Sequence, residues 1–358
     1  MKAYKYLVRP MLFQIDPEKV HNLALRFGSF LGKFSIFRRS LAFFYDYNND
    51  KLQIEVKGIK FKNPVGLAAG FDKNGVMTQI LPSINFGFEE IGSITAKKCE
   101  GNKKPRLFRL IKDKAIVVNY GLCNDGAEII FNRLKSKEFE IPIGISIAKT
   151  NDSTIKSNDS IKDYCTAFKI MQGLGDYVVI NISCPNSGDG KSFEDPVLLG
   201  KLLKKLDKPK KPIFLKLSAD ITQKRLNNII GLSKKYSITG FVVANLTYDK
   251  SGLKTSNECL SKMKGSISGP LIKEKSNNLI KYIYKKTKNK FVIIGVGGIF
   301  NAEDAYERIR NGASLVQLLT GMIYEGPGLI KEINKGLVKL LDRDGFKNIQ
   351  EAVGVDVR

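Results

Sequence analysis

Eight short apolar runs, separated by stretches that can hold a helix, constrain the fold of this chain more than any other feature. The runs lie at residues 64–70, 88–93, 141–147, 177–181, 212–217, 240–245, 291–295 and 315–319. Strands that alternate with helices form a parallel sheet, and a count of eight favours a closed (β/α)8 barrel over an open sheet. We therefore predict an α/β fold, a TIM barrel, with a short hairpin at 53–61 before the first strand.

The net charge of +24 raises two classes of partner, nucleic acid and anionic membrane surfaces. The lysines are scattered along the chain, which favours a solvated basic surface over a specific polyanion site. No apolar run approaches the roughly 18 residues that a membrane span needs, and no signal-peptide pattern is expected. The 358 residues and the hydrophobic share of 43% fit a single barrel with an extension.

The scarcity of histidine and the pattern of cysteines limit the chemistry. Five cysteines form no CxxC pair, and the chain has one histidine, His21, so we predict no metal site and a reducing compartment. Along the chain His21 is far from any predicted strand end, so we do not expect histidine catalysis. Proton transfer should then depend on cysteine, lysine, serine, tyrosine or a carboxylate.

Residues 1–47 differ from the rest of the chain. Asp16 followed by Pro17 predicts a helix start, and apolar residues at helical spacing follow, interspersed with basic residues and few acids. A basic amphipathic helix pair suits a membrane interface, and a helical cap on the main domain is the alternative. We divide the chain into this extension, 1–47, and a barrel domain, 48–358.

Polar residues gather where the predicted strands end. The run 177–180 opens into Asn181-Ile182-Ser183-Cys184-Pro185-Asn186, and Lys216 lies inside an apolar run. In such barrels the carboxyl ends of the strands carry the active site. Because burying an unpaired ammonium is costly, we predict that Lys216 faces a ligand. Cys184, taken alone, is either a buried structural cysteine or a functional one.

Glycines follow the last two strands, in Gly295-Val296-Gly297-Gly298 and Thr320-Gly321. Loops at these positions are the recurrent phosphate site of such barrels. The pattern is not the GxGxxG fingerprint of dinucleotide-binding folds, so a mononucleotide is better supported than NAD. Flavin mononucleotide (FMN) is a natural candidate, and Lys216 would then lie beside the electron-rich edge of its ring.

Four motifs together resemble the dihydroorotate dehydrogenases: 63–73 (NPVGLAAGFDK), 104–109 (KPRLFR), 181–186 (NISCPN) and 294–299 (IGVGGI). The resemblance extends from residue 1 to about residue 333. Residues 9–18 resemble the membrane-associated class 2 enzymes, whose N-terminal helices form a tunnel for quinone. The resemblance therefore favours a quinone entry and a membrane contact for residues 1–47 over a simple cap.

The resemblance implies an FMN-dependent oxidation of (S)-dihydroorotate to orotate in pyrimidine biosynthesis, with electrons passed to a quinone. It implies a peripheral position on the cytoplasmic face of the cell membrane and no specific nucleic-acid partner. Cys184 would act as the base, and Lys216 would also be catalytic. FMN would contact Ala69, Gly70, Lys73, Ser93, Asn119, Ser146, Asn181, Lys216, Ala244, Gly269, Gly298, Leu319 and Thr320. The substrate would contact Lys73, Asn119, Tyr120, Gly121, Leu122, Asn181, Asn186, Asn245 and Leu246.

Some positions depart from the class 2 pattern. Cys184 stands where class 2 enzymes usually have serine, as in the soluble class 1 enzymes, so fumarate or NAD remains an alternative acceptor. Ser146 replaces a usual asparagine, and the loop after Asn119 is one residue shorter.

The rival families are the dihydrouridine synthases, FMN barrels that act on transfer RNA, and a catalytically silent FMN-binding or membrane scaffold. The amphipathic extension and the short C-terminus after the last barrel helix disfavour a dihydrouridine synthase.

Overall fold

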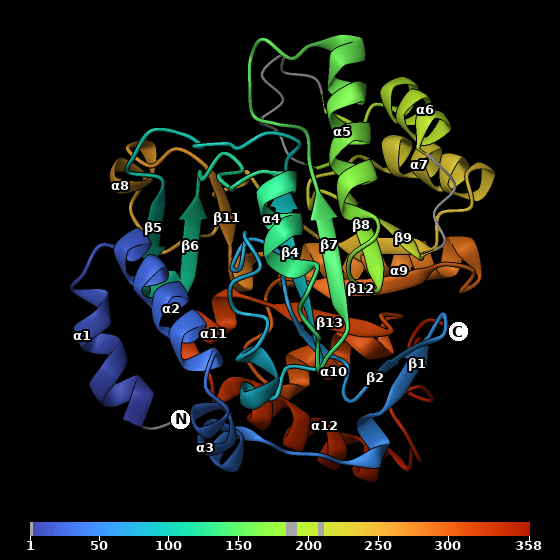
Figure 1. Ribbon diagram of the computed structural model, residues 1–358. Coiled ribbons are helices and arrows are strands. Elements are labelled where there is room, and N and C mark those ends of the chain that lie inside the picture. The colour runs from blue at the N-terminus through green and yellow to red at the C-terminus, as the bar shows by residue number, and fades with distance from the viewer. Residues whose placement is uncertain (1–2, 184–191, 207–210) are drawn as a thin grey trace.

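Eight parallel strands close into a barrel in the computed structural model, which describes residues 3–183, 192–206 and 211–358 (Figure 1). In order around the barrel they are β3 (Val65–Leu67), β4 (Phe88–Ile94), β7 (Ile143–Ile147), β8 (Tyr177–Asn181), β9 (Ile213–Lys216), β10 (Gly240–Val243), β12 (Val292–Val296) and β13 (Leu315–Leu318). All eight predicted strands are confirmed. The parallel register pairs Asn181 with Lys216, which brings two predicted site residues side by side at one end of the barrel.

Helices cover the outside of the barrel: α4 (Ala127–Leu134), α5 (Ser157–Met171), α6 (Pro196–Lys205), α7 (Gln223–Lys235), α9 (Lys273–Thr287), α10 (Ala302–Arg310) and α12 (Leu329–Asp344). Two shorter helices, α8 (Asn257–Ser261) and α11 (Thr320–Glu325), lie in loops after strands. Capping side chains set several starts, since Asp195 accepts the N–H groups of Val197 and Leu198 at α6. Each long helix turns an apolar face inward, and Phe88, Phe241 and their neighbours fill the core.

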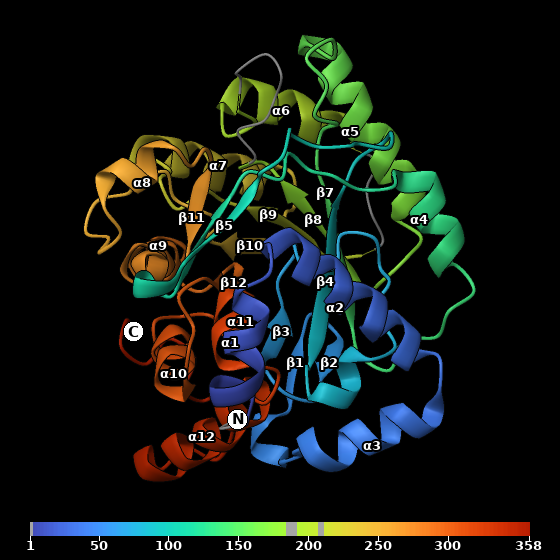
Figure 2. The ribbon, with the colours of Figure 1, turned by 90° about the vertical axis from the view of Figure 1, so that its left-hand side faces the viewer.

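The N-terminal extension is helical, as predicted, but has more elements. It consists of the π-helical turn η1 (Tyr4–Val8), α1 (Arg9–Phe13), α2 (Pro17–Gly32) and α3 (Ser35–Tyr45). The predicted start at Asp16 is confirmed, because its side chain accepts the N–H of Lys19 at 2.9 Å. In Figure 2, α1 and α2 lie in front of the barrel strands. A Cβ at Gly28 would lie 2.3 Å from the sulfur of Met77, so this glycine lets α2 pack closely on the barrel domain.

A three-stranded antiparallel sheet stands beside the barrel and was not predicted. It joins β5 (Leu107–Leu110), β6 (Ala115–Val118) and β11 (Ser266–Ser268), and α2 packs against β5. The predicted hairpin is confirmed as β1 (Ile54–Val56) and β2 (Ile59–Phe61). Four 3-10 turns complete the elements: η2 (Asp50–Leu52), η3 (Leu81–Ile84), η4 (Ile111–Asp113) and η5 (Pro270–Ile272). Within the described part of the chain, no helix is both long and apolar enough to span a bilayer.

Candidate active site

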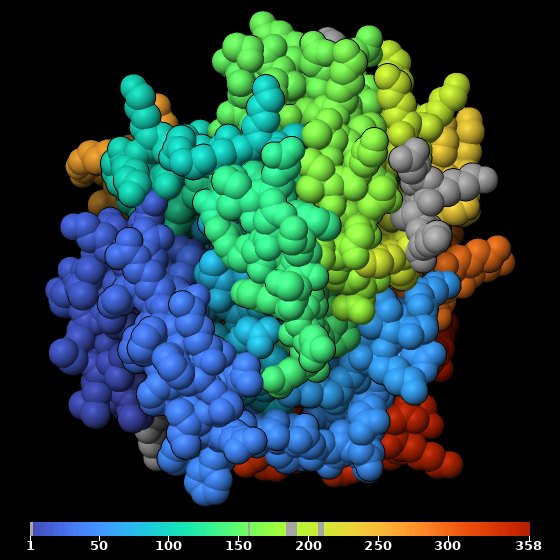
Figure 3. All heavy atoms as spheres, viewed as in Figure 1, coloured from blue at the N-terminus to red at the C-terminus, as the bar shows by residue number. Residues whose placement is uncertain are grey.

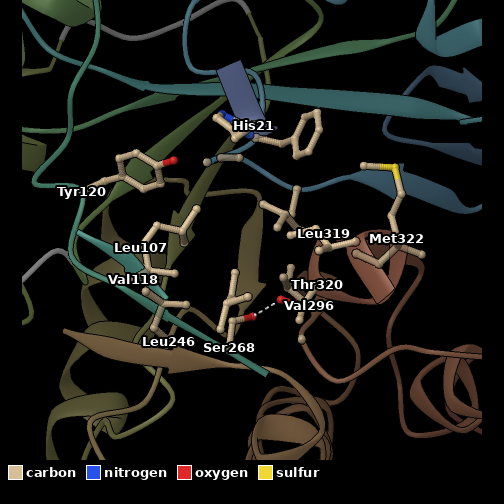
Figure 4. Close-up of a pocket in the computed structure, with 18 of the residues that line it drawn as sticks. His21, Leu107, Val118, Tyr120, Leu246, Ser268, Val296, Leu319, Thr320 and Met322 are labelled. Atoms are coloured by element: carbon tan, nitrogen blue, oxygen red, sulfur yellow. Dashed lines mark hydrogen bonds between the residues drawn. The ribbon is translucent and has the colours of Figure 1, made fainter. Parts of the chain in front are cut away.

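A cavity of about 570 Å³ lies between the carboxyl ends of the barrel strands, the three-stranded sheet and the helices α1 and α2. This volume is within the range of about 300–1,000 Å³ that small-molecule sites occupy. Figure 4 shows His21 and Tyr120 at one end of the cavity and Ser268 with Thr320 at the other. The cavity therefore has two chemically different ends, and one wall of it belongs to the extension.

Most of the predicted site residues line this cavity. They are Ala69, Gly70, Lys73, Ser93, Asn119, Tyr120, Gly121, Leu122, Asn181, Lys216, Ala244, Asn245, Leu246, Gly298, Leu319 and Thr320. Two other predicted residues that the structure describes, Ser146 and Gly269, are not among the lining residues. Cys184 and Asn186 lie outside the described residues.

A chain of hydrogen bonds links the strand ends. Asn245 Nδ2 donates to Ser183 Oγ at 2.9 Å, and Ser183 Oγ donates to Asn181 Oδ1 at 2.9 Å. Asn181 Nδ2 donates to Ser93 Oγ at 2.8 Å, and that hydroxyl lies 2.9 Å from Ser146 Oγ. These bonds fix which way the two amides face the cavity. Ser146 lies behind Ser93. Ser183, part of the predicted polar stretch 181–186, connects the two asparagines, a role that was not assigned to it from the sequence.

Lys216 lines the cavity and is also paired inside the barrel. Its ammonium lies 3.1 Å from Glu90 Oε1, and Gln317 donates to Glu90 Oε2 at 2.8 Å. The Lys216 and Glu90 side chains are 5% and 0% exposed, so this is a buried ion pair. Glu90 and Gln317 are functional neighbours that the prediction missed. The signal was in the sequence, because Glu89-Glu90 and Gln317 interrupt two apolar strands.

The end of the cavity at Ser268 and Thr320 is built from glycines and hydroxyls. Gly297 and Gly298 have φ angles of +97° and +71°, which residues with a side chain rarely adopt. A Cβ on Gly298 would lie 2.8 Å from Lys273 Cβ. The Ser268 and Thr320 hydroxyls are 2.8 Å apart (Figure 4). Bare backbone and hydroxyl donors suit a phosphate, while the amides and Lys216 suit a flat polar ring. The residues present thus fit a flavin mononucleotide.

His21, on α2, reaches the cavity, so the expectation that it is remote from the site is wrong. Its Nε2 lies 3.2 Å from the Lys73 ammonium, which in turn lies 3.9 Å from the centroid of the Tyr120 ring. Burial lowers the pKa of Lys73 to about 8. Burial and then the Lys73 charge lower the pKa of His21 well below its usual value, which keeps the ring neutral. Distance along the chain gave no hint of this contact because α2 folds back over the barrel.

A buried ion pair fixes α2 to the rest of the site. Arg106 donates from Nε to both carboxylate oxygens of Glu18 at 3.2 Å and from Nη2 to Oε1 at 2.9 Å. Burial alone would raise the pKa of Glu18, but the Arg106 guanidinium lowers it below its usual value. Arg106 also donates to the backbone oxygens of Glu100 and Asn102 at 2.7 and 3.0 Å. The same arginine therefore holds both the helix and a loop.

Two further asparagines hold the loop that carries Asn119. Asn102 Nδ2 donates to Asn119 Oδ1 at 2.8 Å. Asn151 Nδ2 donates to Asn102 Oδ1 and to the Gly121 backbone oxygen, both at 3.2 Å. The sequence gave no signal for these partners, since isolated asparagines in loops have no diagnostic spacing.

The chain matches the family model described as "Dihydroorotate dehydrogenase" over residues 51–341. The chain belongs to the dihydroorotate dehydrogenase family. Among curated dihydroorotate dehydrogenases, it is 41% identical to the "Dihydroorotate dehydrogenase (quinone)" of Christiangramia forsetii, with 94% of this chain and 99% of that protein covered. It is 37% identical to the enzyme with the same name from Trichormus variabilis, with 100% of both chains covered.

Solved dihydroorotate dehydrogenases also share the fold. The Eimeria tenella enzyme in complex with ferulenol superposes with a TM-score of 0.85 at 29% identity, with 96% of each chain covered. Its ligand-free form gives a TM-score of 0.84 at 30% identity, with 96% of this chain and 100% of that chain covered. These matches favour the dihydroorotate dehydrogenase assignment over the dihydrouridine synthases, and they include the extension.

Proposed function

We propose that this protein oxidises (S)-dihydroorotate to orotate with bound FMN in pyrimidine biosynthesis and passes the electrons to a quinone. The observation that carries the proposal is the cavity, which joins the polar strand ends of the barrel to an apolar wall formed by the extension. The names of the curated relatives support the quinone as acceptor. The polar half alone would not suit a quinone, and the apolar half alone would not suit dihydroorotate.

The polar half suits a small anionic ring. The Lys73 ammonium would pair with the substrate carboxylate, and it is held in place by His21 and the face of Tyr120. The amides of Asn119, Asn181 and Asn245 offer both donors and acceptors to the ring amides. Because these amides are tied to fixed partners, they present one pattern of donors and acceptors before the substrate arrives.

FMN would be held by the glycines and hydroxyls at its phosphate and by Ser93, Asn181 and Lys216 near its ring. When bound, it supplies the acceptor for the hydride that leaves C6 of the substrate. The Lys216 cation would stabilise negative charge that develops on the ring. Removal of the C5 proton is assigned to Cys184 on the sequence alone, because a thiol ionises far more readily than a hydroxyl.

The apolar half suits a quinone. Leu12, Val20, Met77, Leu107 and other apolar side chains line it next to the extension. Outside, thirteen of the seventeen large apolar side chains that are exposed in the described structure belong to residues 1–47. In Figure 3 the N-terminal segment, coloured blue, forms part of the molecular surface. We propose that this apolar face, with its basic residues, contacts the cytoplasmic face of the cell membrane peripherally.

Flavin absorbance tests both half-reactions on the purified holoenzyme. Anaerobic dihydroorotate should bleach the bound flavin, and a short-chain ubiquinone should reoxidise it faster than fumarate or NAD. A flavin that stays oxidised with dihydroorotate would refute the substrate, and a preference for fumarate or NAD would refute the acceptor. Cys184→Ala should keep bound flavin but lose bleaching; unchanged bleaching would remove Cys184 from its role.

A matched pair of variants tests the entry path. Val20→Trp adds bulk to a residue that lines the apolar half, whereas Leu23→Trp adds it on the same helix at a position that is 55% exposed and not a lining residue. Val20→Trp should slow reoxidation by ubiquinone at least about tenfold while dihydroorotate still bleaches the flavin. Leu23→Trp should change neither rate. Equal quinone rates in the two variants would place the entry elsewhere.

A further inference from the structure

Arg308, on α10, is a fully buried cation directly behind the glycine-rich loop. It is 0% exposed, and its Nη2 donates to the backbone oxygen of Gly297 at 2.6 Å. A second, longer bond of 3.4 Å goes from Nη1 to the Val296 oxygen, and Nε has no hydrogen-bond partner within residues 3–183, 192–206 and 211–358. Among the residues that the structure describes, no carboxylate forms an ion pair with this guanidinium. A buried charge in this state is costly unless an anion lies near it.

Gly295, in the strand β12 just before the loop, makes room for Arg308. A Cβ at Gly295 would lie 2.5 Å from Arg308 Cγ and 2.8 Å from Cδ, closer than real contacts allow. Gly297 and Gly298 instead have positive φ angles and line the cavity. The glycines of the motif 295–298 therefore have two roles. Gly295 leaves space for the Arg308 side chain, and Gly297 and Gly298 form part of the cavity wall.

The two acidic groups that act on the Arg308 charge, Asp304 and Glu307, form their ion pairs with Lys273. Lys273 lies 2.6 Å from Asp304 Oδ1 and 3.0 Å from Glu307 Oε2. Asp304 also accepts the N–H of Phe300 at 2.9 Å. Burial lowers the pKa of Arg308 to about 10, so the group remains protonated at neutral pH. Arg308 thus has no direct ion pair with either carboxylate, and its guanidinium lies one peptide group away from the cavity.

The bond to Gly297 also orients that peptide group. In a planar trans peptide the C=O and the following N–H point in opposite directions. Because the Gly297 oxygen points at Arg308, the Gly298 N–H points away from Arg308, and both glycines line the cavity. An N–H directed at a site with a positive charge behind it favours a bound anion.

We propose that Arg308 is a positioning residue for the phosphate of the flavin: it orients the Gly297–Gly298 peptide and supplies the buried positive charge behind it. The inference rests on the proposed use of FMN. It predicts that Arg308 matters for the phosphate and not for the ring. A purely structural arginine would affect both parts of the ligand equally.

Riboflavin, which lacks only the phosphate, separates the two roles. Full-length protein freed of its flavin is titrated with FMN and with riboflavin, and the quenching of flavin fluorescence gives the two Kd values. Arg308→Gln removes the charge but keeps an amide donor. It should lower the preference for FMN over riboflavin at least about tenfold. This is the size expected for the attraction between the guanidinium and a nearby phosphate at an effective dielectric constant near 20. Arg308→Lys retains the charge and should keep the preference within about threefold of the wild type.

Arg310→Gln is the control on the same helix, since Arg310 pairs with Asp344 and Asp356 instead of the loop. It should leave the preference unchanged. An unchanged FMN preference in Arg308→Gln, or an equal loss for both flavins, would overturn the proposal. If Arg308→Gln does not fold, Arg308→Lys is titrated in its place, and an equal loss of affinity for both flavins in that variant would overturn the proposal. Failure of the wild-type protein to bind FMN would instead refute the proposed function.

Discussion

The Lys216–Glu90 pair allows a sharp test of what holds the barrel interior together. Glu90→Gln keeps the size of the side chain and an oxygen that can accept hydrogen bonds from Gln317 and Lys216, so the change removes charge and little else. Both partners are almost fully buried. Removing one member of a buried pair typically costs about 3–5 kcal/mol, because the other charge is left uncompensated. We expect Glu90→Gln to lower the free energy of unfolding by about that amount.

Coupling between the partners distinguishes this explanation from general damage to the core. Lys216→Met also breaks the pair, and the double variant removes both charges. The double variant should be more stable than the sum of the two single effects predicts, by at least about 1.5 kcal/mol. The measurement is urea unfolding followed by far-UV circular dichroism, because the chain has no tryptophan. Additive effects, within about 0.5 kcal/mol, would refute a stabilising ion pair between these side chains.

Three other predictions concern charged groups. Because burial lowers the pKa of Lys73 to about 8, its positive charge is lost above that pH, so orotate affinity, measured by flavin absorbance, should fall by up to about tenfold per unit above pH 8. Lys73→Gln should bind orotate more weakly, without this dependence. Glu89 is fully buried, and burial and then the charge of Asp72 and a hydrogen bond to it raise the pKa of Glu89 well above its usual value. Folding of the wild type therefore takes up a proton at pH values above about 4.5, so the wild type loses stability as the pH rises. Glu89→Leu lacks this group, so its free energy of unfolding relative to the wild type should rise with pH from about 4.5, by up to about 1.4 kcal/mol per pH unit in urea unfolding. A difference between the two proteins that does not change with pH would contradict this. Glu18→Gln should speed amide hydrogen exchange in α2 but not in the barrel strands, since it removes the buried partner of Arg106.

The barrel was predictable because its signals are local. Each strand is a short apolar run, and the helix starts carry capping residues such as Asp16 and Asp195. Once eight strands alternate with helices, the rules of parallel barrels place their carboxyl ends at one rim. Asn181, Lys216 and Thr320 could therefore be assigned to one site before their positions were known.

What escaped prediction depends on contacts between distant segments. The strands β5, β6 and β11 lie outside the alternation of barrel strands and helices, and β11 comes from a remote part of the chain, so no local pattern pairs them. The sequence assigned Glu18 no role beyond the helix start, and it placed His21 far from the predicted strand ends. Their roles depend on the close packing of α2, which no pattern within α2 encodes.

The extension contacts the polar half of the cavity as well as lining its apolar half. Glu18 holds Arg106, whose guanidinium carbon lies 5.3 Å from the centroid of the Tyr120 ring, and Tyr120 in turn lies under Lys73. Deleting residues 1–47 would remove the carboxylate that pairs with Arg106 and the His21 contact to Lys73. A truncated protein should therefore lose the dihydroorotate half-reaction as well as the quinone half-reaction. Only a substitution that blocks the apolar half without disturbing Glu18 and His21, such as Val20→Trp, can separate quinone access from substrate binding.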